Sequence, residues 1–368
     1  MIKILISGYY GFNNIGDESI LKAVIDNLQE RLTDIDITVL SQNPGSTTEK
    51  FGVKAVNRKS PAAIISAVRR CDLLISGGGS LLQDVTSRRS LLYYLFIIRL
   101  ALLFGRKVLI YSQGIGPINS KRNRKLTASV LKKVSGIVVR DDASKELLTE
   151  IGVEGDQIIV TADPVLRVKP VSIDPGRKIL EAEGFTAEAG KIVVGFAVRE
   201  RKPDSPFAEA LFDTMERLVN EQNARIVLIP FHFSEDMAFI EEASKRLGDK
   251  VFAIRNKYLT DEMLSIIGNM DMLVGVRLHA LIHAAIMDVS MIAISYDPKI
   301  NSFMRSVGMK AMSGVYDFNS EFFLEEFSKT IETGERTRSK VRAHMKELIQ
   351  RLDSNEEMIK RLMGGKQN

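Results

Sequence analysis

The sequence predicts an α/β protein of two Rossmann-like, doubly wound domains that face each other across a cleft. Short runs rich in β-branched residues alternate with stretches of helical periodicity, which is typical of parallel strands covered by helices. This alternation occurs in two series separated by a proline-rich segment. A chain of 368 residues is also long enough for two domains.

The composition excludes several other classes of protein. With 45% hydrophobic and 26% charged residues, the chain is neither disordered, nor collagen-like, nor a polytopic membrane protein. Its single cysteine, Cys71, cannot form an internal disulfide, and its start lacks the three regions of a signal peptide. We therefore expect a cytoplasmic protein, either free or peripheral at the inner face of the plasma membrane.

The first series contains seven candidate strands, most of them followed by glycine or a polar turn residue. They are residues 3–8, 37–42, 53–57, 73–78, 107–114, 137–141 and 158–163. Residues 164–177 contain three prolines and lack helical periodicity, so they predict a linker.

The second series contains five candidate strands, again separated by helical stretches. They are residues 192–199, 225–231, 250–255, 272–277 and 291–297. From about residue 320 onward the chain is charged and amphipathic, which predicts long helices. The predicted division is a first domain over 1–170, a second over 171–320 and C-terminal helices over 321–368.

One region is strongly basic. Between Asp84 and Asp141 the sequence has no acidic residue and twelve basic ones, although the net charge of the whole chain is only +5. The region includes an apolar run over 91–105, which is too short to cross a hydrocarbon core of about 30 Å. It predicts either a buried helix or a helix lying on a membrane surface, with basic flanks attracted to anionic lipid or a lipid-linked diphosphate.

Two glycine-rich segments follow strands of the first series. In GYYGFNNIGDES (8–19) the spacing excludes dinucleotide-binding and P-loop motifs, and Asn14 and Asp17 open a predicted helix. Asp17 either faces a ligand or only complements the helix dipole. In SGGGSLLQD (76–84) three glycines precede another predicted helix and indicate a ligand-facing loop rather than a plain turn. This loop offers Gly78, Gly79, Ser80 and Gln83 as contacts.

Cations and histidines follow strands of the second series. Arg277 and His279 lie where a strand passes into a helix, and Arg199 and Lys299 follow other strands of the same predicted sheet. A parallel sheet would bring these side chains to one edge, where they suit a small anion carrying phosphate or carboxylate. Taken singly, such residues are often solvated strand ends, and the same holds for Arg140 and His232.

A metal site is not expected. His279 and His283 are four residues apart on one helical face, but Ala280 stands where a zincin needs glutamate. No third ligand stands nearby in the sequence.

The ordered motifs GYYGFNNIGDE, GGGSLLQD, QGIGP, VRD, ADP, RLHALIHA and SYDPK, spread over residues 5–300, resemble the polysaccharide pyruvyl transferase family, most closely its cell-surface-anchoring (CsaB) type. The resemblance implies a GT-B-like architecture and transfer of the enolpyruvyl group of phosphoenolpyruvate onto two sugar hydroxyls as a cyclic ketal. The implied acceptor is a lipid-diphosphate-linked disaccharide containing N-acetylmannosamine, and the implied product is a secondary cell-wall polymer that anchors S-layer proteins. Phosphoenolpyruvate is the substrate, and no cofactor is expected.

The resemblance also implies roles for residues. Arg277 and His279 match the donor-site arginine and the catalytic histidine, Lys299 matches a cationic partner, and Arg199 is a further donor contact. We expect His279 to donate a proton and Asp17 to orient or deprotonate an acceptor hydroxyl. The first domain is then the acceptor side, with residues 85–140 facing the membrane, and the second is the phosphoenolpyruvate side. Expected acceptor or loop contacts are Asn14, Gly78, Gly79, Ser80, Gln83, Arg140 and His232.

Two alternatives stay open. A nucleotide-sugar glycosyltransferase can have the same two-domain shape, because a fold does not determine its chemistry. A noncatalytic, membrane-associated scaffold could bind anionic polymer through residues 85–140. Nucleic-acid binding is not expected, because no recognised motif accompanies the basic region and the chain has no tryptophan.

Overall fold

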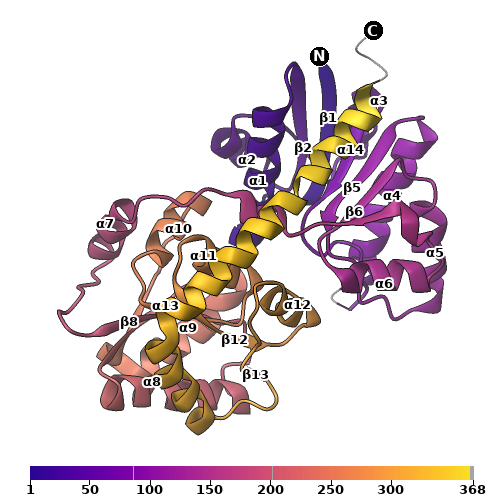
Figure 1. Ribbon diagram of the computed structural model, residues 1–368. Coiled ribbons are helices and arrows are strands. Elements are labelled where there is room, and N and C mark those ends of the chain that lie inside the picture. The colour runs from indigo at the N-terminus through magenta and orange to yellow at the C-terminus, as the bar shows by residue number, and fades with distance from the viewer. Residues whose placement is uncertain (86, 201, 365–368) are drawn as a thin grey trace. The chain divides into compact units, whose positions relative to one another are not determined.

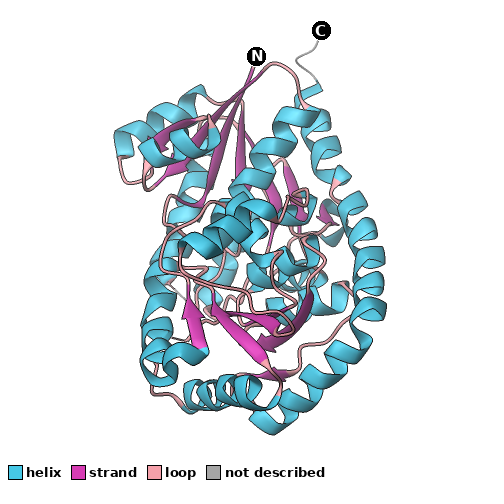
Figure 2. Ribbon diagram, turned by 90° about the vertical axis from the view of Figure 1, so that its left-hand side faces the viewer, coloured by secondary structure: helices cyan, strands magenta, loops and turns pink. Residues whose placement is uncertain are grey.

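The computed structural model describes residues 1–85, 87–200 and 202–364. The chain divides into two compact units, the first formed by Met1–Arg167 with Leu348–Asn368 and the second by Val168–Glu347. Each unit is a parallel β-sheet covered by helices (Figures 1 and 2). The predicted fold class of two Rossmann-like units is therefore confirmed.

The first unit has a seven-stranded parallel sheet in the order β3-β2-β1-β4-β5-β6-β7. The strands are β1 (Ile2–Tyr10), β2 (Ile35–Ser41), β3 (Lys54–Asn57), β4 (Leu73–Gly77), β5 (Lys107–Gln113), β6 (Gly136–Val139) and β7 (Ile158–Val160). Leucine and isoleucine dominate β4, whose residues are all buried, as expected of a strand covered on both faces. The strand order reverses between β1 and β4, which is where such sheets bind ligands.

Seven helices cover this sheet within the described part of the first unit. They are α1 (Ile15–Arg31), α2 (Pro44–Phe51), α3 (Pro61–Arg70), α4 (Arg88–Leu103), α5 (Lys121–Leu131), α6 (Asp142–Glu150) and α14 (Asp353–Met363). Polar side chains at Asn14, Asn43, Ser60, Ser87 and Asp141 accept hydrogen bonds from the first turns of five of them, as helix N-caps do. Helices α4, α5 and α6 lie on one side of the sheet and α14 on the other (Figure 1).

The second unit repeats the topology with six parallel strands in the order β10-β9-β8-β11-β12-β13. The strands are β8 (Ile192–Ala197), β9 (Ala224–Leu228), β10 (Val251–Ala253), β11 (Met272–Gly275), β12 (Ser290–Ser295) and β13 (Ser313–Gly314). The helices are α7 (Asp174–Ala182), α8 (Pro206–Glu221), α9 (Phe233–Leu247), α10 (Thr260–Ile267), α11 (Leu278–Ile286), α12 (Pro298–Ser306) and most of α13 (Ser320–Arg351). Here the strand order reverses between β8 and β11.

Three local predictions were wrong. Residues 164–177 are not all linker, because a 3-10 turn spans Pro164–Arg167 and α7 begins at Asp174 with a proline in its first turn. No helix follows the three glycines directly, since the next helix begins only at Arg88. Strand β13 was not predicted, because two half-buried residues give no periodic signal.

The C-terminal helices do not form a segment of their own. Helix α14 packs on the sheet of the first unit, where Nδ2 of Asn355 donates to Oγ of Ser112 at 2.8 Å. The buried Glu356 accepts from Nη1 of Arg167 at 2.9 Å and from the Tyr111 hydroxyl at 3.3 Å. The chain therefore returns to its first unit after passing through the second.

Candidate functional site

Four adjacent strands of the second sheet bring the predicted cations to one edge. Arg199 follows β8, Arg277 follows β11, Lys299 follows β12 and His232 follows β9. Because the strands are parallel, all four residues lie beyond the carboxyl ends of the strands. Arg199 and Arg277 flank the point where the strand order reverses.

A buried carboxylate orients Arg277. This residue is the N-cap of α11, with a side chain 12% exposed, and its Nη2 forms an ion pair with Asp236, which is 1% exposed. Asp236 also accepts hydrogen bonds from the backbone N–H groups of Phe231 at 3.0 Å and His232 at 2.8 Å. Burial acts to lower the pKa of the Arg277 guanidinium, but Asp236 keeps it above its ordinary value. The guanidinium is therefore a fixed positive charge.

Glu235 lies between two of the arginines. Its Oε2 is 3.3 Å from Nη2 of Arg277 and 4.0 Å from Nε of Arg199, and its side chain is 29% exposed. In contrast to the buried Asp236, the Glu235 carboxylate is accessible to solvent. Another anion can therefore take its place beside the two arginines.

Arg199 and Lys299 both lie close to the aromatic ring of Tyr296. The guanidinium carbon of Arg199 lies 4.4 Å from the ring centroid, and Nζ of Lys299 lies 5.7 Å from it. Nζ of Lys299 is also 3.3 Å from a carboxylate oxygen of Asp297, the N-cap of α12. The predicted residues Arg199, Arg277 and Lys299 thus belong to one connected group of side chains. We call it the cation cluster and define it as Arg199, Glu235, Asp236, Arg277, Tyr296 and Lys299.

Three histidines lie close in sequence to residues of the cation cluster, and one of them, His232, interacts with it. His279 lies in the first turn of α11 and is half-buried, and His283 lies one turn later, fully buried against the ring of Phe231. Burial, together with the neighbouring His279, lowers the pKa of His283 to about 3. Burial also lowers the pKa of His232, although Glu235 acts in the opposite direction. Among the residues that the structure describes, no group of three or more His, Cys, Asp or Glu side chains is arranged to hold a metal ion.

The first sheet presents glycine loops at its carboxyl edge. Gly78 and Gly79 have φ angles of +70° and +66°, and a Cβ atom at position 78 would lie 1.8 Å from Cγ2 of Ile20. A Cβ atom at position 79 would lie 3.0 Å from Oδ1 of Asp17. The structure therefore places the glycine loop directly against the start of α1, beside the predicted Asp17.

Two of the other predicted loop residues hold local structure. Oδ1 of Asn14 caps α1 by accepting from the N–H of Gly16 at 3.0 Å. Oε1 of Gln83 accepts from the N–H of Val85 at 2.9 Å, within its own loop.

Arg140 and Ser80 form a buried connection between loops of the first unit. Nη1 of Arg140 lies 3.0 Å from Asp163 and Nη2 donates to Oγ of Ser80 at 3.1 Å, with the Arg140 side chain 5% exposed. The guanidinium packs so closely on Gly114 that a Cβ atom there would lie 2.7 Å from Nη2. Although burial acts to lower the pKa of Arg140, Asp163 keeps it raised.

Arg58, which we did not predict as a functional residue, is a second buried arginine at this edge. Four aromatic rings surround its guanidinium carbon at 4.5 to 5.9 Å, and Nη1 donates to the carbonyl of Gly8 at 3.0 Å. The rings belong to Tyr9, Phe12, Tyr93 and Tyr94. A single arginine after a short strand gives no sequence signal for such a cage. Glu235, Asp236 and Tyr296 were missed for the same reason, although each is close in sequence to a predicted residue.

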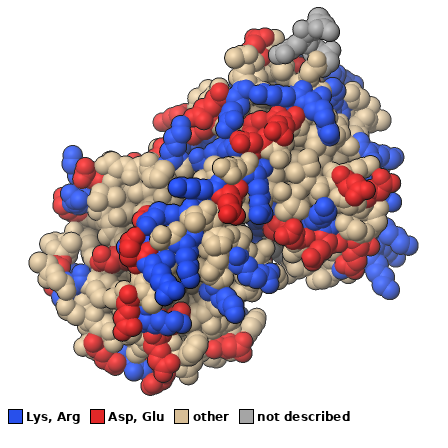
Figure 3. Space-filling model, in the orientation of Figure 1, with Lys and Arg blue, Asp and Glu red and all other residues tan. Residues whose placement is uncertain are grey.

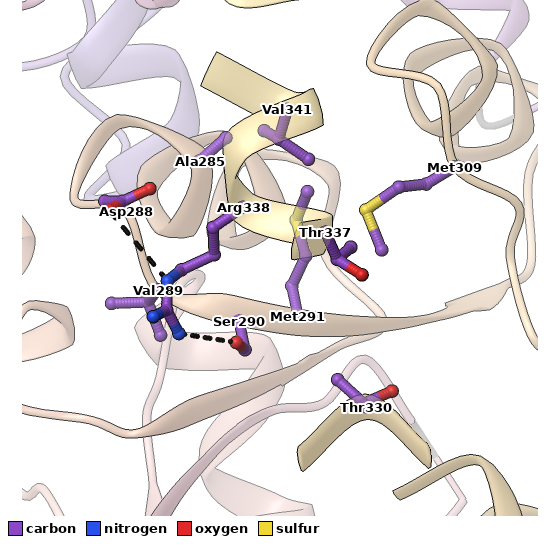
Figure 4. Close-up of a pocket in the computed structure, with 10 residues that line it drawn as sticks. All are labelled: Ala285, Asp288, Val289, Ser290, Met291, Met309, Thr330, Thr337, Arg338 and Val341. Atoms are coloured by element: carbon purple, nitrogen blue, oxygen red, sulfur yellow. Dashed lines mark hydrogen bonds and ion pairs between the residues drawn. The ribbon is translucent and has the colours of Figure 1, made fainter. Parts of the chain in front are cut away.

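A pocket lies at the opposite edge of the second sheet, beneath α13 (Figure 4). Ser290, the first residue of β12, lines it and accepts a hydrogen bond from Nη1 of Arg338 at 3.1 Å. Tyr296 of the cation cluster follows the last residue of the same strand. The pocket is therefore separate from the cluster, and five of its ten lining residues are apolar. Its lining is Ala285, Asp288, Val289, Ser290, Met291, Met309, Thr330, Thr337, Arg338 and Val341.

Solved structures share this fold over nearly the whole chain. A UDP-GlcNAc 2-epimerase from Neisseria meningitidis, bound to UDP-GlcNAc, is 14% identical with a TM-score of 0.68, covering 99% of this chain and 100% of the other. Anabaena Alr3699/HepE in complex with UDP-glucose is 13% identical with a TM-score of 0.65 and the same coverage. At these identities the likeness concerns the fold alone.

The sequence comparisons identify the family. The amylovoran biosynthesis protein AmsJ of Erwinia amylovora is 22% identical over an alignment of 372 positions, which covers 85% of this chain and 88% of that protein. The pattern of the polysaccharide pyruvyl transferases matches residues 14–298, a range that includes Asp17, Arg199, Arg277 and His279 and ends one residue before Lys299. The chain therefore belongs to the polysaccharide pyruvyl transferase family.

Proposed function

We propose that the protein transfers the enolpyruvyl group of phosphoenolpyruvate onto two hydroxyls of a sugar, forming a cyclic ketal during polysaccharide biosynthesis. One observation carries the proposal. In a chain of this family, a continuous series of contacts through Tyr296 and Glu235 links Lys299, Arg199 and Arg277 at the carboxyl edge of the second sheet. His279 follows Arg277 by two residues. This edge combines fixed positive charge with a group that can donate a proton.

Phosphoenolpyruvate carries a carboxylate and a phosphate, and the cation cluster offers a position for each. Arg277 is held in one orientation by Asp236, so it can bind a carboxylate or phosphate oxygen without first ordering its side chain. Arg199 and Lys299 are 25% and 27% exposed and remain accessible to a ligand. The carboxylate of Glu235 lies between Arg277 and Arg199 and shows that an anionic group fits there. We propose that one anionic group of the donor replaces it at this position.

The reaction then needs one acid and two hydroxyls. His279 donates a proton to the methylene carbon, and the C2 centre develops oxocarbenium character. The first sugar hydroxyl attacks C2 and loses its proton, and the C2–O bond to phosphate breaks with the electron pair leaving on the phosphate. The second hydroxyl closes the ring and its proton is released. The sum is phosphoenolpyruvate plus a diol giving a pyruvate ketal and inorganic phosphate, with no redox change.

We assign the acceptor to the first unit, where the Asp17 carboxylate lies beside the backbone of the glycine loop at Gly78 and Gly79. Asp17 would orient or deprotonate an acceptor hydroxyl. Within the family we favour the cell-surface-anchoring (CsaB) type. Its acceptor would be a lipid-diphosphate-linked disaccharide containing N-acetylmannosamine, and the pyruvylated secondary cell-wall polymer would anchor S-layer proteins.

Incubation of the purified protein with a synthetic lipid-like disaccharide and either phosphoenolpyruvate or a nucleotide sugar tests the proposal. We expect a ketal mass gain on the sugar and an equal amount of inorganic phosphate, from phosphoenolpyruvate only. Arg277→Lys is the informative variant, because it keeps the charge but loses the fork that can bind two oxygens at once. Arg217→Lys, on the exposed surface of α8, is its control.

The alternatives predict other results. Sugar transfer from the nucleotide sugar alone would identify a glycosyltransferase. The absence of any product with either donor, across acceptors that differ in sugar and lipid, would leave the noncatalytic scaffold.

A further inference from the structure

The outward face of α4 is an apolar stripe with one arginine in it, because the exposed Arg99 lies on the same line between Phe96 and Leu103. Leu92, Phe96 and Leu103 are 46%, 54% and 79% exposed, and their spacing of four and seven residues puts them on one line along the helix. The opposite side of the helix, with Tyr94 and Ile98, is fully buried in the core of the first unit. The buried side agrees with the predicted buried helix, and the exposed side is the one to which the membrane-surface prediction applies.

Such exposure is concentrated in this part of the chain. Ten large hydrophobic side chains are exposed among the residues that the structure describes, and four of them are Val85, Leu92, Phe96 and Leu103. Exposed apolar side chains that recur on one face of a helix mark an interaction surface more often than scattered single residues do. The stripe therefore calls for a partner.

The charged residues of α4 and of the neighbouring α5 are all basic. Arg88, Arg89 and Arg99 are exposed on α4, and the neighbouring α5 exposes Lys121, Arg122 and Lys125. In Figure 3, Lys and Arg side chains project at the right-hand edge, where Figure 1 places α5. The whole stretch from 85 to 140 has no acidic residue. Arg124 of α5 is not part of this group, because it pairs with Glu150 at 2.6 Å.

We propose that this face, defined as Val85, Leu92, Phe96 and Leu103 with the six basic residues named above, docks the protein onto an anionic lipid bilayer. Apolar side chains enter the boundary between headgroups and acyl chains, while arginines keep their charge among the lipid phosphates. A second copy of this chain is disfavoured, because two such faces would bring like charges together. Within the described ranges no helix is long and apolar enough to span a membrane, so the contact would be superficial.

The buried side of α4 connects this face to residues 8–14, the segment that leads to Asp17. We call this segment the acceptor loop, because Asp17 is the proposed acceptor contact. Tyr93 and Tyr94 of α4 pack around Arg58, which donates to the carbonyl of Gly8. Residues 8–14 lead directly into Asp17. Docking of α4 would therefore hold the acceptor loop near the lipid surface. This last step rests on the proposed function, whereas the docking itself does not.

The chain has no tryptophan, so Phe96→Trp introduces a single fluorophore at the centre of the stripe. With vesicles of phosphatidylcholine and phosphatidylglycerol, we expect a blue-shifted emission and protection from acrylamide. Vesicles of phosphatidylcholine alone should give a weaker response. Phe322→Trp on α13 is the matched control, because Phe322 is 51% exposed, and its emission should not change.

Binding affinity measured by vesicle flotation separates the two contributions. Phe96→Asp should weaken binding at least tenfold by placing a charge in the apolar layer. The double change Arg88→Gln and Arg89→Gln should weaken it roughly fivefold for each residue, and less at high salt. Arg336→Gln with Lys340→Gln, two exposed residues of α13, is the charge control and should bind as wild type does.

Two results would overturn the docking proposal. One is an unshifted Phe96→Trp emission with anionic vesicles. The other is a blue shift that grows with protein concentration in the absence of vesicles, which would assign the face to a second copy. Neither assay contains donor or sugar, so their outcome is independent of the proposed reaction. Conversely, Phe96→Asp should leave pyruvyl transfer onto a water-soluble acceptor unchanged.

Discussion

The carboxyl edges of the two sheets differ in how they use arginine. In the first unit, Arg58 is buried among aromatic rings and Arg140 is held by Asp163 and Ser80. In the second unit, Arg199 and Lys299 keep about a quarter of their side chains exposed, and only Arg277 has a buried carboxylate partner. At the edge of the first sheet, arginine side chains thus connect loops within the protein. At the edge of the second sheet, they keep positive charge accessible to a ligand.

The difference does not come from topology, because both sheets have the same strand order around the point of reversal. It comes from the residues after the strands. In the first unit glycines at 78 and 79 bring neutral backbone to the edge, whereas Arg199 and Arg277 occupy the equivalent region of the second. The uncharged sugar hydroxyls of an acceptor suit the first edge, and a small anion suits the second.

The largest effect is expected at His279. His279→Asn should lower kcat for pyruvyl transfer by about 10²- to 10⁴-fold, because the amide cannot donate the proton that the methylene carbon needs. Turnover measured by phosphate release checks this, with the unfolding midpoint in urea as a fold control. His344→Asn, on α13, should leave turnover unchanged. A kcat within about threefold of wild type would remove His279 from the mechanism.

Replacing the buried Arg140, at the edge of the first sheet, should instead change the stability of the protein. Arg140→Met should lower the free energy of unfolding by about 3 to 5 kcal/mol, because Asp163 would stay buried without its cation. Adding Asp163→Leu should restore much of the loss, since both charges are then gone. Urea unfolding of the single and double variants measures this. Equal instability of the two variants would show that the ion pair is not the cause.

The exposed arginine of the second edge should affect donor binding instead. Arg199→Gln should raise the KM for phosphoenolpyruvate roughly tenfold, the value of one charged hydrogen bond, with a smaller change in kcat and none in the unfolding free energy. Steady-state kinetics at varied donor concentration test the split. A change confined to the KM for the sugar would place Arg199 on the acceptor instead.

Much of the fold could be predicted because its signals are local. The twelve predicted strands all correspond to strands of the structure, since a β-branched run and its following turn are adjacent in sequence. The return of α14 could not be predicted in this way. It depends on contacts such as Arg167 with Glu356, which are 189 residues apart. No periodic pattern records such a pairing.

The candidate site was predictable in part for the same reason. The carboxyl ends of neighbouring parallel strands must share an edge, so a strand-end cation such as Arg277 could be assigned to it. Its partner Asp236 could not, because the two residues are 41 positions apart and meet only through the strand order. The sequence also could not show which side of α4 is buried. A run that is apolar on all sides has no helical periodicity from which the buried side can be predicted.

The smallest effect concerns Glu18, a buried carboxylate at the edge of the first sheet. Burial raises its pKa above 4.5, although its Oε1 accepts a hydrogen bond from the N–H of Gly11 at 2.9 Å. A raised carboxyl pKa gives stability that is fully present below the unfolded pKa and is lost as the pH rises through the folded pKa.

Glu18→Gln keeps an acceptor for the N–H of Gly11 and removes this loss of stability. Its free energy of unfolding should therefore equal that of wild type well below pH 4.5 and slightly exceed it near neutral pH. Urea unfolding at both pH values measures the difference, with Glu49→Gln on the exposed side of α2 as the control for simple loss of charge. A variant less stable than wild type near neutral pH would mean that the ionised carboxylate is needed at this edge, which would bring the first unit closer to the second in its use of charge.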